Sequence, residues 1–137
     1  MKLKLVLDEI KDLSNKIHQD RGLLKFYKRQ ADMIPGPIYG EKIHTQPSGK
    51  APFEKWVIKA LDKEKEIKEE EDTLADLKLK ATNALEKLEN KDMALAIMYR
   101  HISFMTYDEI MLAMYVSRSS LYRLLNEAEE VMKSLDV

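Results

Sequence analysis

The chain has 137 residues, of which 45% are hydrophobic and 34% are charged, and its formal net charge is −1. It contains no cysteine, which excludes a disulfide framework, a thiolate metal site and a thiol nucleophile. Helix-forming residues dominate and no segment shows alternating β-branched residues, so we expect an all-α fold.

The charge is distributed unevenly along the chain. Residues 1–50 carry a net charge of +4, residues 51–91 carry −2 and residues 92–137 carry −3. An acidic C-terminal part is unfavourable for nucleic-acid binding, because phosphate contacts normally dominate the affinity. We therefore expect weak binding by a single copy, unless two copies act together or the basic N-terminal part contributes.

Nothing in the sequence indicates a membrane protein. The first apolar run ends at Asp8 and Glu9, too early for a signal peptide. No segment approaches the roughly 20 apolar residues that span a bilayer. A soluble, cytoplasmic protein is expected.

Residues 3–31 show an apolar heptad pattern, which indicates a coiled-coil helix. The pattern positions are Leu3, Val6, Ile10, Leu13, Ile17, Asp20, Leu24, Tyr27 and Ala31. Only Asp20 is polar among them. The partner of this helix is either the second long helix of the same chain or another subunit.

Residues 33–52 are rich in proline and glycine, which predicts a long connection without a helix. His44 lies in this segment without neighbouring ligand residues, so we predict no metal site there.

A second long helix is expected from Phe53 to about Asn90. Its apolar stripe consists of Trp56, Val57, Ala60, Leu61, Ile67, Leu74, Leu77, Ala81, Leu85 and Leu88. Glu64 and Glu71 fall near the seam of this stripe. We expect the charged run 62–72 to be solvated, and its glutamates to lack the burial that shifts pKa values for catalysis.

Asn90, Lys91 and Asp92 interrupt this helix, and Asp92 can cap the next one. Residues 93–102 are largely apolar and should form a supporting helix. Several methionines concentrate in and after this helix, and we expect them to fill the core, although the same adaptability would suit docking on a partner protein. They are Met93, Met98, Met105, Met111, Met114 and Met132.

Two helix starts lie close together in the C-terminal part. Thr106 and Glu109 have the spacing of a capping box, and Ser117 supplies a second N-cap oxygen. Two capped helices with so short a connection indicate a helix-turn-helix, with residues 117–133 as the second helix.

The polar face of that second helix carries hydrogen-bonding side chains suited to phosphates and base edges. Free N–H groups at the start of the helix favour an anion such as a phosphate. The candidate DNA-binding residues are Thr106, Ser117, Arg118, Ser119, Ser120, Tyr122, Arg123 and Asn126. The alternative is a merely solvated face, in which Arg123 and Glu127 form a surface ion pair.

This part of the chain resembles the region-4-like helix-turn-helix of sigma factors and, more closely, phage and prophage late-gene regulators of the ArpU and RinA type. The matching residues are Arg100, Phe104, Thr106, Tyr107, Asp108, Glu109, Ile110, Ser117, Leu121, Arg123, Leu124 and Ala128. The resemblance implies that Arg100 packs or touches the backbone, and His101 stands where an aromatic residue is usual, which suggests packing. The chain departs from the pattern at Met111 and Met114, and at Tyr115, where glycine is common. A bulky residue at positive φ costs about 1 kcal/mol or more, so we expect a reshaped turn at Tyr115.

We therefore expect residues 1–91 to form a helical coiled-coil or bracing region and residues 92–137 to form a DNA-binding domain. The predicted function is a dimeric, sequence-specific transcriptional regulator of phage or prophage type that binds double-stranded DNA and, by the resemblance, activates late genes. The alternative is an adaptor that docks on RNA polymerase without reading DNA. We expect no enzymatic activity, cofactor or metal, because the sequence contains no Gly-rich phosphate loop and no metal-ligand spacing.

Overall fold

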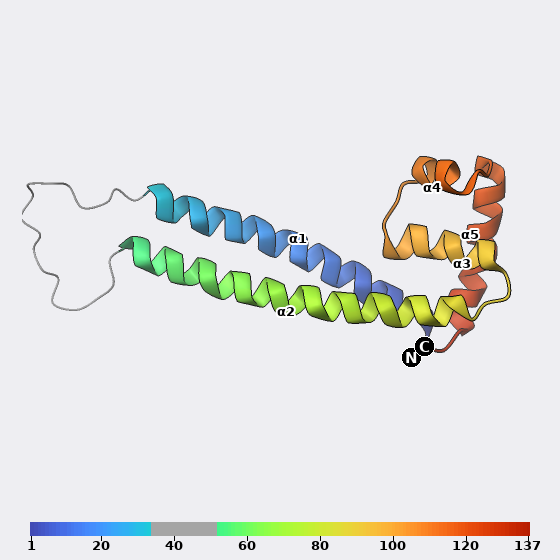
Figure 1. Cartoon of the computed structure of the whole chain (residues 1–137), viewed down its shortest axis with the longest axis horizontal. Helices are drawn as coiled ribbons and strands as arrows, with labels where there is room; N and C mark the ends of the chain where they lie inside the picture. Colours follow the sequence, from blue (N-terminus) through green and yellow to red (C-terminus); the bar gives the residue numbers. More distant parts are fainter. Residues whose placement is uncertain (34–51) are drawn as a thin grey trace, which may run out of the picture. The chain divides into compact units, whose positions relative to one another are not determined.

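The computed structural model describes residues 1–33 and 52–137. In this part the fold is all-α, as predicted, with five α-helices and one π-helical segment (Figure 1). The helices are α1 (Leu3–Met33), α2 (Pro52–Glu86), α3 (Lys91–Ile97), α4 (Tyr107–Met114) and α5 (Arg118–Ser134), and η1 (Met98–Ile102) is the π-helical segment. The predicted connection 33–52, including His44, lies outside the described residues except for its two ends. No helix of the described part is long and apolar enough to cross a membrane.

The described residues form two compact units. The first consists of residues 1–14 and 72–137, and the second of residues 15–71. The predicted boundary between residues 1–91 and 92–137 falls inside the first unit. The division into a bracing region and a DNA-binding domain stays a prediction.

The first unit is organised around one hydrophobic core, to which four helices contribute. The start of α1 and the end of α2 pack with α3 and α5. Fully buried residues of this core are Leu3, Val6, Ile10, Ala81, Leu85, Ile97 and Ala128. The chain ends also pair, since Leu3 N donates to Leu135 O at 2.7 Å and Val137 N donates to Met1 O at 2.9 Å. The helix-turn-helix therefore shares its core with parts of both long helices.

The heptad pattern of α1 is confirmed by burial. Of the predicted seam residues, Leu3, Val6, Ile10, Ile17 and Asp20 are buried, and the others are partly buried. In the second unit, Arg21 pairs with Glu71 at 2.7 Å and Lys28 pairs with Glu64 at 2.8 Å. The helix thus pairs with α2 of the same chain.

The predicted seam of α2 needs correction. Val57 and Leu61 are 40% and 58% exposed, and Glu64 and Glu71 lie at the flank of the helix pair, where they form the ion pairs with α1. Heptad spacing counted from Trp56 and Ala60 leads instead to Lys63, Ile67, Glu70, Leu74, Leu77 and Ala81, which are buried or partly buried. The charged run 62–72 is therefore not solvated throughout.

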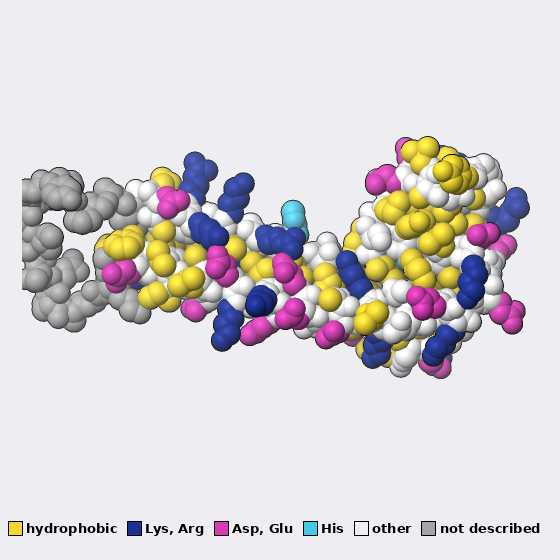
Figure 2. All heavy atoms as spheres, viewed as in Figure 1, with side chains coloured by type: hydrophobic (Ala, Val, Ile, Leu, Met, Phe, Trp, Pro, Cys, Tyr) yellow, Lys and Arg dark blue, Asp and Glu magenta, His cyan; other side chains and the backbone are white. Residues whose placement is uncertain are grey.

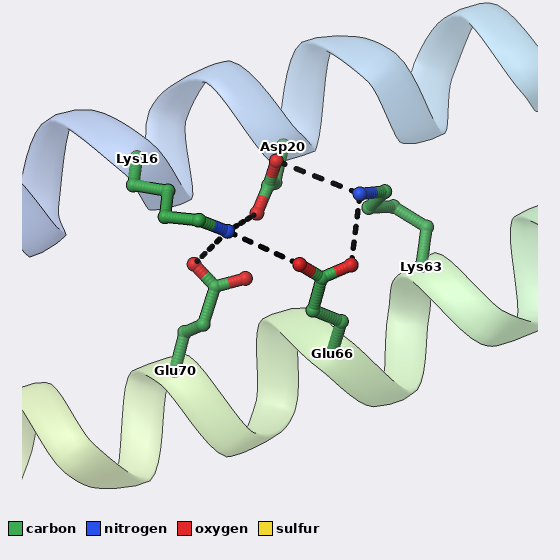
Figure 3. A network of polar contacts seen from close by, with 5 residues as sticks. All are labelled: Lys16, Asp20, Lys63, Glu66 and Glu70. Carbon is green, nitrogen blue, oxygen red and sulfur yellow. Dashed lines mark hydrogen bonds and ion pairs between the residues drawn. The ribbon is translucent and has the colours of Figure 1, made fainter.

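A network of charged groups lies at this seam in the second unit (Figure 3). Lys16 Nζ contacts carboxylate oxygens of Asp20 at 2.8 Å, Glu66 at 3.1 Å and Glu70 at 3.3 Å. Lys63 Nζ contacts Glu66 at 2.8 Å and Asp20 at 3.6 Å. The Asp20 side chain is only 8% exposed, and a buried charge of this kind is tolerated when it is paired and hydrogen-bonded.

Burial shifts the pKa of Glu70, contrary to the prediction that glutamates of this run would be unaffected. Desolvation and the adjacent Asp20 raise the pKa of Glu70, whose buried Oε1 has no hydrogen-bond partner among the described residues. The pKa of Asp20 is lowered, first by the hydrogen bond from Lys16. The neutral form of Glu70 is therefore favoured by folding, whereas the charged form of Asp20 is favoured.

The sign of this shift predicts a pH-dependent effect of Glu70→Gln. A raised folded-state pKa contributes stability that is present below the unfolded pKa and is lost as the pH rises through the folded value. At neutral pH the glutamine, which cannot ionise, should therefore stabilise the protein, and the gain should diminish towards pH 4.5, the ordinary pKa of this group. Urea unfolding at both pH values measures it. The control is Glu71→Gln, at a 45% exposed side chain, which should show no comparable gain. Equal effects of the two variants would contradict the prediction.

The supporting helix differs from its prediction at both ends. The N-cap is Asn90, whose side chain accepts a hydrogen bond from Met93 N at 3.1 Å, and Asp92 lies in the first turn instead. The α-helix ends at Ile97, and the chain continues as η1, in which Ser103 N donates to Met98 O at 3.0 Å. The wider π-helical turn directly precedes the loop to α4.

The turn between α4 and α5 is not reshaped at Tyr115. Tyr115 is the C-cap of α4 and adopts the left-handed conformation, with φ 55° and ψ 45°. Its backbone N–H donates to Met111 O, as in a helix end closed by glycine. The expectation of a different turn was wrong, because the chain accepts the backbone cost at a tyrosine.

Replacement of Tyr115 by glycine should therefore stabilise the fold. The side chain is 95% exposed, so its removal costs little burial, while glycine relieves a penalty of about 1 kcal/mol. Thermal unfolding should show a higher midpoint for Tyr115→Gly. Tyr115→Ala removes the same ring but keeps the penalty and serves as the control. A gain of the same size in both variants would mean that backbone strain is not its origin.

Candidate nucleic-acid interface

The start of α4 is fixed by the predicted capping box. Thr106 N donates to Glu109 Oε1 at 3.2 Å, and Glu109 N donates to Thr106 Oγ1 at 3.2 Å. Thr106 is exposed at this helix start. Its hydroxyl oxygen accepts within the cap and retains a proton that it can donate to a ligand.

The start of α5 is also capped as predicted. Ser117 Oγ accepts from Ser120 N at 3.2 Å and donates to Ser120 Oγ at 3.0 Å. The helix thus begins with an ordered pair of hydroxyl groups beside its free N–H groups, an arrangement that favours an anion.

A small core joins the two helices of the helix-turn-helix. Ala96, Ile110 and Leu121 are fully buried and form its centre. The predicted core role of the methionines is confirmed. Met93 and Met132 are buried, and the other four are partly buried against the two cores.

A row of cationic and aromatic side chains supports α5 from the side of α4. The Arg100 guanidinium lies 4.4 Å from the centre of the Tyr107 ring, and Arg100 Nη1 donates to Met105 O at 3.0 Å. The implied packing and backbone contact of Arg100 are therefore confirmed. Tyr107 and Tyr122 meet edge to face with centroids 5.2 Å apart. Tyr122, a candidate DNA-binding residue, is thus also a packing residue.

Arg118 is held by partners of its own chain. Its Nη2 pairs with Asp108 Oδ1 at 2.9 Å, and its Nη1 lies 3.5 Å from the Tyr122 hydroxyl. The Arg118 and Asp108 side chains are 54% and 77% exposed. Exposed pairs of this kind contribute little energy, about 0–1 kcal/mol, so Arg118 can exchange Asp108 for a phosphate.

Three candidate residues have free polar side chains. Ser119, Arg123 and Asn126 are exposed and make no side-chain hydrogen bond or ion pair with the described residues. Arg123 does not pair with Glu127, so the surface ion pair considered from the sequence is not formed. Their spacing places all three on one face of α5, away from buried Leu121.

The charges of the helix are segregated along its length. The stretch 117–126 contains Arg118 and Arg123 and no acidic residue, whereas Glu127, Glu129 and Glu130 follow in the second half. The net charge of −3 over residues 92–137 therefore conceals a basic half-helix at the capped end.

The sequence reasoning missed the roles of Tyr107 and Asp108 as partners of the candidate residues. They are the first two residues after the N-cap Thr106, and only this position in the sequence indicated that they lie near the candidate residues. Their contacts depend on the crossing of α4 and α5, which no local pattern specifies.

Two other places in the described part of the chain bring together polar groups that could hold a ligand. Carboxylate oxygens of Asp20, Glu66 and Glu70 lie within 4.8 Å of one another, as a cation site requires, but Lys16 already contacts all three. This arrangement indicates a structural network.

A cavity of about 330 Å³ in the first unit combines apolar residues with charges of both signs. It is lined by Lys4, Leu7, Asp8, Lys11, Arg100, His101, Phe104, Glu129 and Met132. Burial is the main cause that lowers the pKa of His101, which favours the neutral ring and fits the expected packing role.

Loss of either cap should destabilise the interface. Thr106→Ala and Ser117→Ala each remove a side-chain acceptor from a helix start, and we expect each to cost about 1 kcal/mol. Thermal or urea unfolding measures this cost. Ser119→Ala, at an exposed hydroxyl without a partner, is the matched control and should unfold like the unchanged protein. An unchanged midpoint in both cap variants would show that the caps contribute nothing.

Comparison with family models, with curated proteins and with solved structures found no match for this chain. The likeness to phage regulators and to sigma region 4 therefore stays a prediction from the residues of the helix-turn-helix.

Proposed function

We propose that this protein is a sequence-specific DNA-binding transcriptional regulator, with α5 as the helix that enters the major groove. One observation carries the proposal: the capped start of α5 presents Ser119, Arg123 and Asn126 on one exposed face without partners in the described chain. Unpaired hydrogen-bonding groups on a supported helix are what base recognition requires.

Each side chain of this face has a preferred counterpart on DNA. Arg123 can donate two hydrogen bonds to guanine O6 and N7, and Asn126 can form a bidentate pair with adenine. Ser119 can donate to or accept from several bases. These contacts would provide the sequence specificity of the complex.

The surrounding residues are suited to phosphates. Ser117 and Ser120 flank the positive end of α5, and Arg118 can leave the exposed Asp108 for a phosphate oxygen. Thr106 marks a second helix start, with free N–H groups of α4. Contacts of this kind fix the orientation of a protein on DNA, whereas base contacts select the site.

Two copies would compensate for the low charge of one copy. Tethered reading units bind with a raised effective concentration. We therefore propose a homodimer, and a DNA-binding regulator of phage or prophage genes would act in the cytoplasm. Activation of phage or prophage late genes is supported by the resemblance of the helix-turn-helix alone.

The test is binding of fluorescent duplexes selected from a randomised pool, measured by anisotropy at about 50 and 200 mM salt. Arg123→Ala should weaken binding to the selected site by about 10- to 100-fold and leave binding to random duplexes nearly unchanged. Arg118→Ala should weaken both alike. Lys133→Ala, which removes a cation from the last turn of α5, is the control and should have little effect.

A second candidate function is an adaptor that docks on RNA polymerase. It is favoured by the 77% exposed Leu112 on α4, whose first turn carries the acidic Asp108 and Glu109. Failure of every duplex to bind at the lower salt concentration would overturn DNA reading. A direct binding measurement with purified RNA polymerase, comparing the unchanged protein with Leu112→Ala, would then test the adaptor.

A further inference from the structure

Tyr115 combines two unfavourable features. Its backbone is left-handed, with φ 55°, and its side chain is 95% exposed. The side chain makes no hydrogen bond or ring contact with the described residues. The fold therefore gains nothing visible from the ring, while glycine would satisfy the same backbone at lower cost.

The position of Tyr115 relates it to the start of α5. It lies two residues before the N-cap Ser117 and three before Arg118, in the short connection between α4 and α5. The adjacent helix start has free N–H groups, two hydroxyl groups and a cation. A nucleic acid bound at the start of α5 would also pass beside the exposed Tyr115 side chain.

We propose that Tyr115 contacts the DNA backbone beside the major groove, with its hydroxyl donating to a phosphate oxygen and its ring packing on a deoxyribose. This inference rests on the proposed function and extends its interface to a residue outside α5. Tyrosine is among the residues that contact the phosphate backbone in protein–DNA complexes, and such contacts do not depend on base sequence. Backbone strain retained at a functional position is consistent with this role.

The inference predicts that stability and affinity change in opposite directions in Tyr115→Gly. This variant should melt at a higher temperature and yet bind duplex DNA about tenfold more weakly, because a hydrogen bond to a charged group is lost. The loss should be the same for a selected site and for random duplexes. Tyr115→Phe, which keeps the ring, should show a smaller loss. Leu79→Ala, at an exposed apolar residue of α2, is the control and should bind normally.

The outcomes separate this inference from the function on which it rests. If the unchanged protein binds and Arg123→Ala loses the selected site, but Tyr115→Gly binds as well as the unchanged protein, the inference is overturned and the proposed function stands. A loss confined to the selected site would also overturn it, since a base contact would then be responsible. If the unchanged protein binds no duplex, both fail together.

Discussion

The helix-turn-helix depends on one shared hydrophobic core, in which the start of α1 and the end of α2 pack with α3 and α5. Its fully buried residues include Ile10, Leu85, Ile97 and Ala128. Burial of each of the larger apolar side chains contributes roughly 1.5–3 kcal/mol to the stability of the fold. The helix-turn-helix cannot replace this contribution without α1 and α2. The second, smaller core around Ile110 then fixes α4 to α5. The orientation of the candidate reading face follows from both.

Charged groups determine how the long helices meet in the second unit. Asp20 occupies an apolar seam position, where an unpaired charge would be strongly destabilising, by about 3–5 kcal/mol. Lys16 pairs with Asp20 within α1, whereas the contact of Lys63 with Asp20 and those of Lys16 with Glu66 and Glu70 join α1 to α2 (Figure 3). The cross-helix contacts of this network require the present register of α1 and α2 in the second unit.

Figure 2 shows basic and acidic side chains interspersed with hydrophobic ones along the long helices of the described part. The exposed ion pairs between these helices, such as Arg21 with Glu71 and Lys28 with Glu64, contribute little to stability. The seam network differs because Asp20 and Glu70 are nearly covered. Charge density along the sequence does not distinguish these two situations.

Local features of the chain could be predicted from the sequence. The capping box at Thr106, the cap at Ser117 and the heptads of α1 each depend on residues within one or two turns, and the structure confirms them. The seam of α2 was misplaced because Lys63 and Glu70 occupy positions normally held by apolar residues. The left-handed Tyr115 was missed because the pattern contains no glycine there. The partners of Arg118 and Tyr122 depend on tertiary packing.

The unit that carries the candidate interface is discontinuous in sequence, and this has a consequence for its synthesis. Leu3, Val6 and Ile10 are synthesised long before Ala128 and Met132, with which they share this core. The core can close only after α5 has been synthesised, and such long-range contacts slow folding. The candidate interface should therefore form late relative to the synthesis of α1, and the pairing of Leu3 with Leu135 and of Met1 with Val137 can form only at that stage.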